Sequence, residues 1–501
     1  MRESELVQQE QTDRFENDIL TPRSYGIYPM RNFPKFIFSL NFLYLILIAA
    51  ESVAIIFLCL YIPAFLPVAA AFVGIWLITL TAVIAVVCRG GSPEINLSLV
   101  LFLIALPAAG AVIYAFSLFC KKECGTLTIT GANPARGYES VAYETCGICG
   151  AGYDKAVYFK NGEEFFPALF KEIERARERV YLEYFIVRKG EIFSQLLSAL
   201  RTAKRNGAEI KIIIDGIGSA FKTRRKDYKK LKALGAEIKI FHRLVPLVYP
   251  RLNNRDHRKI AAIDGKTAFT GGFNIADEYA NIKSPLGYWK DTGVAIYGDA
   301  ARIFEGMFLS VWNCGHKMKY KSNGKYRCLP FYDSPPQRAG FCENAYSAAI
   351  FSAKERVHIF TPYFCPSEKL ASALEFAALR GADVRIVIPH IPDKKYAFEL
   401  SKASAIPLIA KGIKFYEYTP GFMHAKSMVC DNRAFIGSYN FDFRSMRLNY
   451  ECGVMFDGEI CRQAESDFWE CLRLSAPLRE GKLSLPRRFY RFIIKLFAPL
   501  M

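Results

Sequence analysis

The stretch "HAKSMVCDNRAFIGSYN" (residues 424–440) sets a histidine, a lysine and an aspartate at H-x-K-x-x-x-x-D spacing and ends on an asparagine. The stretch "HRKIAAIDGKTAFTGGFN" (257–274) repeats this pattern, and in both an Ala-Phe pair and two small residues precede the asparagine. One H-x-K is common by chance, whereas two copies in a shared framework indicate a duplication. The equivalent residues are His257 and His424, Lys259 and Lys426, Asp264 and Asp431, and Asn274 and Asn440.

The repeat extends beyond these motifs. "GAEIKIIID" (207–215) matches "GADVRIVIP" (381–389), and a later pair of blocks sets Asp291 opposite Glu451. Apolar strand patterns alternate with helical patterns in both copies, which is typical of an α/β fold. We therefore expect two tandem α/β domains that pack about a pseudo-twofold axis and bring both motifs into one cleft.

The motif residues suit phosphate chemistry. Residues i and i+2 of a strand point to the same face, so each histidine lies beside its lysine. Lysine and amide donors from two halves would form a preorganised socket for a phosphate diester, and they would stabilise charge that develops on its oxygens. The candidate phosphate ligands are Lys259, Asn274, Lys426, Ser438 and Asn440.

Two histidines in one cleft can divide the labour of group transfer. One neutral imidazole attacks phosphorus to give a phosphohistidine, and the other protonates the leaving oxygen. Asp291 and Glu451 are the candidates to orient the imidazoles. Asp264 and Asp431 complete the motif and so enter the candidate catalytic set, although their odd step along the strand points them away from the histidines. The scheme uses no metal or cofactor.

Composition favours a membrane protein. The formal charge of +18 favours anionic partners such as phospholipid surfaces or nucleic acid. A hydrophobic fraction of 51% argues for the lipid and against nucleic acid. Apolar runs at about 36–62, 67–87 and 97–119 each reach the roughly 20 residues of a membrane-spanning helix. We expect a multi-pass cell-membrane protein, and the basic remainder with its scattered cysteines favours a cytoplasmic catalytic part.

Shifts in composition define the expected segments. Cys146 and Cys149 form one C-x-x-C pair without a second pair, so a structural turn is favoured over half a zinc site. The C-terminal segment mixes basic and aromatic residues, which fits either a helix in the headgroup layer or a packed helix. The expected segments are a polar tail (1–35), a transmembrane region (36–120), a connecting segment (121–154), a first catalytic half (155–322), a linker (323–342), a second catalytic half (343–480) and a basic amphipathic segment (481–501).

Together these motifs resemble the phospholipase D superfamily. Within it, "LEYFIVRKGEIF" (182–193), "IDGIGS" (214–219) and "YWKDTGVAIYG" (288–298) are similar to bacterial cardiolipin synthases. The resemblance implies two phospholipase D-like domains and transfer of a phosphatidyl group from one phosphatidylglycerol to another, with release of glycerol. It also implies that the His, Lys and Asn residues of both motifs surround the phosphate, and His257 is the working choice of nucleophile.

Three other functions are compatible with parts of the sequence. A hydrolytic phospholipase D would use the same site, and phosphatidylethanolamine could replace phosphatidylglycerol as acceptor. A nuclease of the superfamily suits the charge but not the apolar runs. A non-enzymatic binder of anionic lipids would not need two complete H-x-K sets.

Overall fold

The computed structural model describes residues 53, 65–88, 93–118, 125–130, 150–219, 223, 225–242, 254–335, 340–479 and 483–498. Residues 1–75 and 76–501 form two compact units, and both copies of the repeat lie in the second. The polar tail (1–35), the first apolar run except Val53, and Cys146 with Cys149 lie outside the described residues.

The first copy of the repeat forms a seven-stranded sheet. Its strand order is β3-β10-β8-β7-β4-β5-β6. The β4, β5 and β6 strands pair in parallel, and the remaining pairs are antiparallel. The strands are β3 (Lys155–Phe159), β4 (Arg179–Tyr184), β5 (Glu209–Asp215), β6 (Glu237–Phe241), β7 (Lys259–Ile263), β8 (Thr267–Gly271) and β10 (Gly293–Tyr297).

The second copy forms a nine-stranded sheet with the order β2-β12-β21-β19-β18-β13-β15-β16-β22. Its seven central strands follow the order of the first sheet, which confirms the duplication that the sequence predicted. The strands are β2 (Ala151–Tyr153), β12 (Tyr326–Asp333), β13 (Arg356–Phe360), β15 (Asp383–Pro389), β16 (Lys414–Tyr418), β18 (Ser427–Cys430), β19 (Arg433–Gly437), β21 (Glu451–Phe456) and β22 (Ser475–Pro477).

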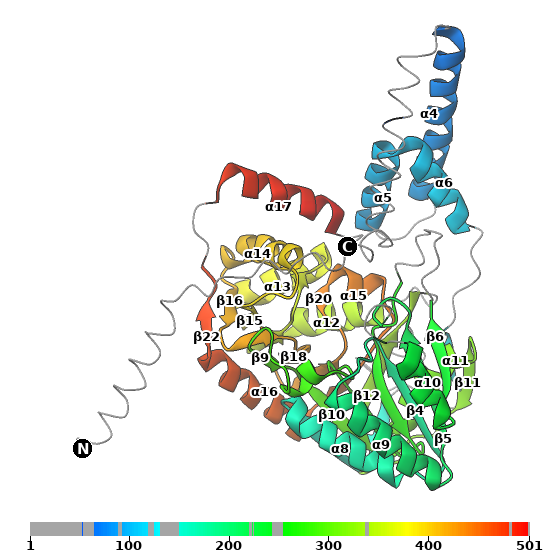
Figure 1. Ribbon diagram of the computed structural model, residues 1–501. Helices are drawn as coiled ribbons and strands as arrows, with labels where there is room; N and C mark the ends of the chain where they lie inside the picture. The colour runs from blue at the N-terminus through cyan, green and yellow to red at the C-terminus, as the bar shows by residue number, and fades with distance from the viewer. Residues whose placement is uncertain are drawn as a thin grey trace. The chain divides into compact units, whose positions relative to one another are not determined.

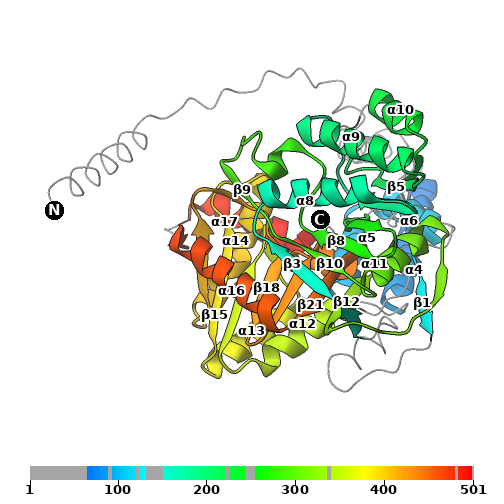
Figure 2. The ribbon, with the colours of Figure 1, turned by 90° about the horizontal axis from the view of Figure 1, so that it is seen from below.

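Helices cover the sheets, as Figures 1 and 2 show. In α8, Asn161 caps the N-terminus by accepting the backbone N–H of Glu164 at 2.9 Å, and Phe165, Leu169 and Ile173 are buried at helical spacing. The helices of the two copies are α8 (Gly162–Arg175), α9 (Glu191–Arg205), α10 (Arg225–Ala233), η2 (Asp277–Ala280), α11 (Ala301–Trp312), α12 (Phe341–Ser352), α13 (Glu368–Leu379), α14 (Lys395–Ile409), α15 (Phe443–Arg447), α16 (Gly458–Arg473) and α17 (Leu485–Phe497).

The two sheets share one buried core. A single apolar cluster contains Ala262 and Ile296 of the first sheet together with Val454 of the second. Because apolar surface of both halves is buried in one core, the halves form a single packed unit and not two independent domains. Smaller pairs also join distant segments: β1 (Leu127–Thr130) with β11 (His316–Lys319), β14 (Phe364–Cys365) with β20 (Phe441–Asp442), and β9 (Tyr288–Lys290) with β17 (Gly421–Met423).

The predicted linker at 323–342 is corrected by the structure. Residues 326–333 form β12, which pairs with β21 inside the second sheet and with β2 at its edge. Proline and charge suggested an irregular segment, yet Cys328, Leu329 and Phe331 are buried. At Pro330, pairing with β21 and burial of the neighbouring apolar side chains outweigh the low preference of proline for strands.

The later apolar runs form helices in the first described part of the chain. Residues of the second run lie in α4 (Phe65–Cys88). The third run is divided at Pro107 into α5 (Pro93–Ala105) and α6 (Pro107–Leu118), because proline favours the first turn of a helix over its interior. Within the described residues, no helix has both the length and the apolar character required to cross a membrane.

The cysteines do not favour one compartment. Eight described cysteines carry free thiols, including Cys430 and Cys452, whereas Cys314 is disulfide-bonded. Disulfides persist in oxidising compartments, so the cysteine pattern lends no support to the cytoplasmic placement expected above.

Candidate active site

The chain segment that carries each motif is hydrogen-bonded to the backbone of the opposite half. The backbone N–H of His257 donates to the carbonyl of Tyr450 at 2.9 Å, and that of Tyr450 donates to Arg255 at 2.8 Å. In the other direction, the N–H of His424 donates to the carbonyl of Lys290 at 2.7 Å, next to the β9–β17 pair. Each histidine therefore lies beside the residue that precedes the other half's carboxylate.

Each histidine also has a carboxylate partner from the opposite half. The Nδ1 of His257 lies 2.9 and 3.0 Å from the two carboxylate oxygens of Glu451. The Nδ1 of His424 lies 2.5 Å from Oδ2 of Asp291. A carboxylate on Nδ1 fixes the ring orientation and the tautomer, and it directs the reactive lone pair to Nε2.

Further hydrogen bonds hold the two carboxylates. The Ser438 hydroxyl donates to Glu451, and the Asn449 amide donates to the same carboxylate at 3.1 Å. The backbone N–H of Thr292 donates to Asp291 at 2.8 Å. Ser438 was expected to bind phosphate, but its fully buried hydroxyl has this carboxylate as its partner instead.

Both imidazoles are held neutral. Burial lowers the pKa of His257 to about 4, although Glu451 acts in the opposite direction. Burial lowers the pKa of His424 well below its ordinary value, and the positive charges of Lys426 and Lys259 add to the effect. A neutral imidazole is the nucleophilic form, so the site presents two potential nucleophiles.

The two lysines lie beside the histidines as the strand alternation predicted. Lys259 donates to the backbone carbonyl of His257 at 2.5 Å, and Lys426 donates to that of His424. The Nζ of Lys426 also lies 2.9 Å from Nδ1 of His424. Burial lowers the pKa of Lys259 to about 7 and that of Lys426 to about 8, and each lysine is affected by carboxylates of the site.

The two asparagines have different surroundings. Asn274 accepts the backbone N–H of Ile186 at 3.0 Å and donates to the Tyr279 hydroxyl at 2.6 Å. Asn440 buries its Oδ1 without a hydrogen-bond partner. An unsatisfied buried amide oxygen is costly unless a ligand completes it, which makes Asn440 the asparagine with capacity for a bound group.

Asp264 and Asp431 lie elsewhere, which corrects their inclusion in the catalytic set. Asp264 accepts three backbone N–H groups of residues 177–179 at 2.8–2.9 Å, and Asp431 accepts three of residues 354–356 at 3.0–3.1 Å. Both adopt positive φ values, 52° and 48°, in the turn after the motif strand. They anchor the start of the neighbouring β4 and β13 strands.

Aromatic rings around the histidines were missed by the sequence analysis. The Phe185 ring centroid lies 5.2 Å from that of His257, and the rings of Tyr279 and Trp289 lie 5.2 and 5.1 Å from His424. Such rings lower the local dielectric and account for part of the burial that keeps the imidazoles neutral. The i, i+2 rule could have found Trp289, because it precedes Asp291 by two residues.

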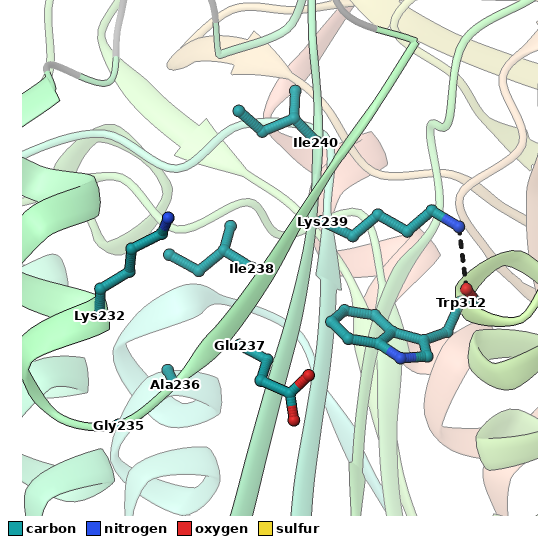
Figure 3. Close-up of a pocket in the computed structure, with 8 residues that line it drawn as sticks. All are labelled: Lys232, Gly235, Ala236, Glu237, Ile238, Lys239, Ile240 and Trp312. Carbon is teal, nitrogen blue, oxygen red and sulfur yellow. Dashed lines mark hydrogen bonds between the residues drawn. The ribbon is translucent and has the colours of Figure 1, made fainter.

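A separate surface hollow of about 690 Å³ lies at the edge strand β6 (Figure 3) and contains no motif residue. The Lys239 amino group donates there to the carbonyls of Val311 and Trp312 at 2.7 and 2.9 Å. Cations commonly satisfy the last carbonyls of a helix, so this lysine caps α11. Across the described ranges, no group of three or more His, Cys, Asp or Glu side chains is placed to hold a metal ion.

Comparison with known proteins supports the resemblance. The family model described as "Cardiolipin synthase, PLD-like domain" matches residues 169–307 and 346–472. A cardiolipin synthase of Geobacillus sp. (strain WCH70) is 34% identical over 68% of this chain and 71% of its own. A cardiolipin synthase of Listeria monocytogenes serotype 4b is 33% identical over 68% and 74%.

A solved structure supports the fold independently. Phosphatidylserine synthase of Haemophilus influenzae Rd KW20 superposes with a TM-score of 0.55 at 14% identity, over 73% of this chain and 100% of its own. Because the sequence identity is so low, this similarity is evidence for the fold alone. The family match over two segments, the sequence relatives and the duplicated site lead to one conclusion: this chain belongs to the phospholipase D-like cardiolipin synthase family of phosphatidyltransferases.

Proposed function

We propose that the protein makes cardiolipin and glycerol from two molecules of phosphatidylglycerol. The observation that carries the proposal is the reciprocal pairing of His257 with Glu451 and His424 with Asp291, which gives one site two equivalent imidazoles. The cardiolipin synthases among the relatives support the choice of a phospholipid substrate.

In the first step, Nε2 of His257 attacks the phosphorus of one phosphatidylglycerol. A phosphorus–nitrogen bond forms, the bond from phosphorus to the glycerol headgroup oxygen breaks, and protonated His424 gives its proton to that oxygen. Glycerol leaves, and the phosphatidyl group stays on the enzyme as a phosphohistidine.

In the second step, a headgroup hydroxyl of another phosphatidylglycerol attacks the same phosphorus. His424, now neutral, takes the hydroxyl proton, the phosphorus–nitrogen bond breaks, and cardiolipin forms. Lys259 and Lys426 stabilise the phosphoryl oxygens in both steps. The amide oxygen of Asn440 can accept a hydrogen bond from a headgroup hydroxyl.

Substrate binding sets the protonation state that this scheme requires. Burial is the main cause of the lowered pKa of both histidines, and the positive charges of the two lysines lower it further. A phosphate diester bound between the lysines offsets their charge, so the imidazole that serves as acid regains a proton on binding. This coupling links general-acid catalysis to occupancy of the site.

We also propose a multi-pass membrane location with the catalytic part at the bilayer surface. Three apolar runs in the first 120 residues support this proposal, because each has about the number of apolar residues that a membrane span needs in the sequence, although the structure divides the third run at Pro107. The concentration of lipid hydroxyl groups is higher at the bilayer surface than in bulk water. Attack by a lipid hydroxyl is therefore favoured there over attack by water.

Product analysis with phosphatidylglycerol as the only lipid tests the function. We expect cardiolipin and glycerol in equal amounts, and no cardiolipin from His257→Ala or His424→Ala. Phosphatidic acid and glycerol would instead identify a hydrolase. Acid-labile, base-stable label on His257 after a quench with radiolabelled lipid would report the covalent step, and label on His424 would exchange the two roles.

A further inference from the structure

The C-terminal helix α17 has two faces of opposite character. Leu485, Phe489 and Phe492 follow helical spacing and are 77%, 66% and 61% exposed. Arg488 and Lys495 lie on the same side and are also exposed. These five residues form what we call the outer stripe. No acidic residue occurs in the helix, so the outer stripe is apolar and positively charged at once.

The opposite side of α17 is fixed to the protein. Arg491 and Ile494 are only 6% and 4% exposed. The guanidinium groups of Arg487 and Arg491 both bind Glu399 of α14, at 2.6 and 2.8 Å, and Figure 1 shows α17 lying across α14. The inner contacts hold the helix in place, and the outer stripe faces away from α14.

The helix α14 in turn begins next to the active site. Its N-cap residue Lys394 contributes to the lowered pKa of His424, and the preceding Asp393 accepts the Tyr363 hydroxyl at 2.5 Å. Glu399, which anchors α17, lies about one turn further along. The outer stripe is therefore tied to the element that starts at the catalytic cleft.

We infer that the outer stripe of α17 docks on an anionic bilayer surface and so holds the cleft against the membrane that supplies both substrates. Exposed aromatic and aliphatic side chains enter the acyl boundary, while cations bind the lipid phosphates. A second copy of this chain fits less well, since its own stripe carries the same charge. The role given to docking, which is to bring the cleft to its lipid substrates, rests on the proposed function. The docking itself is argued from the residues of α17 alone.

Depth-dependent fluorescence quenching tests the docking in the full chain. The Phe489→Trp variant is reconstituted into phosphatidylglycerol-containing vesicles whose acyl chains carry bromine near the headgroup. Tyr326→Trp, at an exposed aromatic of β12, is the matched control. We expect bromine to quench the added emission at position 489 and not at 326. Equal quenching at both positions, or a blue shift at 489 without bromine quenching, would overturn the inference.

A second variant links docking to turnover. Leu485→Ser, Phe489→Ser and Phe492→Ser together should lower turnover on anionic vesicles about threefold to tenfold. Turnover of a monomeric short-chain phosphatidylglycerol should be unchanged. An equal loss on both substrates would mean a folding defect and contradict the inference. If cardiolipin synthesis itself is wrong, wild-type protein makes none from either substrate, yet the quenching result still stands.

Discussion

The two motif strands differ sharply on the face that points away from the site. Immediately before β7, Arg258 lies between His257 and Lys259 and is fully buried, bound to Glu183 at 2.6 Å and Asp256 at 3.2 Å. In the second half, Ala425 has the equivalent position. It packs in an apolar cluster that includes Phe360, the counterpart of Glu183 in the repeat.

This difference shows which features the chemistry constrains. The same His and Lys point to the site in each half, whereas the back face carries an ion network in one half and apolar side chains in the other. Alternation separates the two sets of side chains, because side chains one residue apart point to opposite faces. An ion network and an apolar cluster can therefore support the same geometry.

The largest effect is expected from the carboxylates that cross between the halves. Glu451→Gln and Asp291→Asn should each lower kcat at least about a hundredfold, because the amide neither fixes the tautomer nor stabilises the imidazolium. Initial rates of cardiolipin formation measure this effect. Glu459→Gln, at an exposed position of α16, should leave the rate unchanged. A loss below tenfold in either crossing variant would contradict the reciprocal arrangement.

The back faces are expected to differ next in stability. Arg258→Met leaves Glu183 and Asp256 buried without their cation, so the free energy of unfolding should fall by about 3–5 kcal/mol. Urea denaturation followed by circular dichroism measures it. The triple variant Glu183→Phe, Asp256→Met, Arg258→Ala imports the second half's apolar residues and should regain most of the loss. Equal stability of the two variants would show that charge balance is not what supports β7.

A smaller and symmetrical effect is expected at the two turns. Asp264→Asn and Asp431→Asn should each lower the free energy of unfolding by about 1–3 kcal/mol, with kcat unchanged. Burial acts to raise the pKa of each carboxyl, but three backbone N–H bonds outweigh it and lower the pKa. Their contribution is thus complete above the ordinary pKa of 3.8 and is lost as pH falls through the lowered pKa. Losses of very different size would mean that the turns are not equivalent.

The smallest effect is expected in the pH profile of kcat/KM. Burial raises the pKa of Asp291 to about 6, so activity should fall below that pH as the carboxyl is protonated. Above about 7 to 8 the lysines lose their charge and phosphate binding weakens. In the Lys426→Arg variant, position 426 stays positively charged at alkaline pH. The loss of activity at alkaline pH should then follow the deprotonation of Lys259 alone or disappear. An unchanged loss would exclude Lys426 as its cause.

Much of this protein could be predicted from spacing. The matched blocks predicted two equivalent α/β halves, and the i, i+2 relation placed Lys259 beside His257 and Lys426 beside His424. It also separated Asp264 and Asp431 from the histidines. Local period is enough for these statements, because strand geometry fixes which side chains share a face.

Other features depend on contacts between distant segments. The proline-containing β12 was read as a linker because its partner β21 lies more than a hundred residues away, and Ser438 was assigned to phosphate because its buried partner Glu451 could not be seen. The sequence by itself determined the duplicated α/β units and the paired histidines and lysines. Only the tertiary structure decided that each histidine takes its carboxylate from the opposite half, because a choice between two equivalent partners is made by how the sheets pack and not by order along the chain.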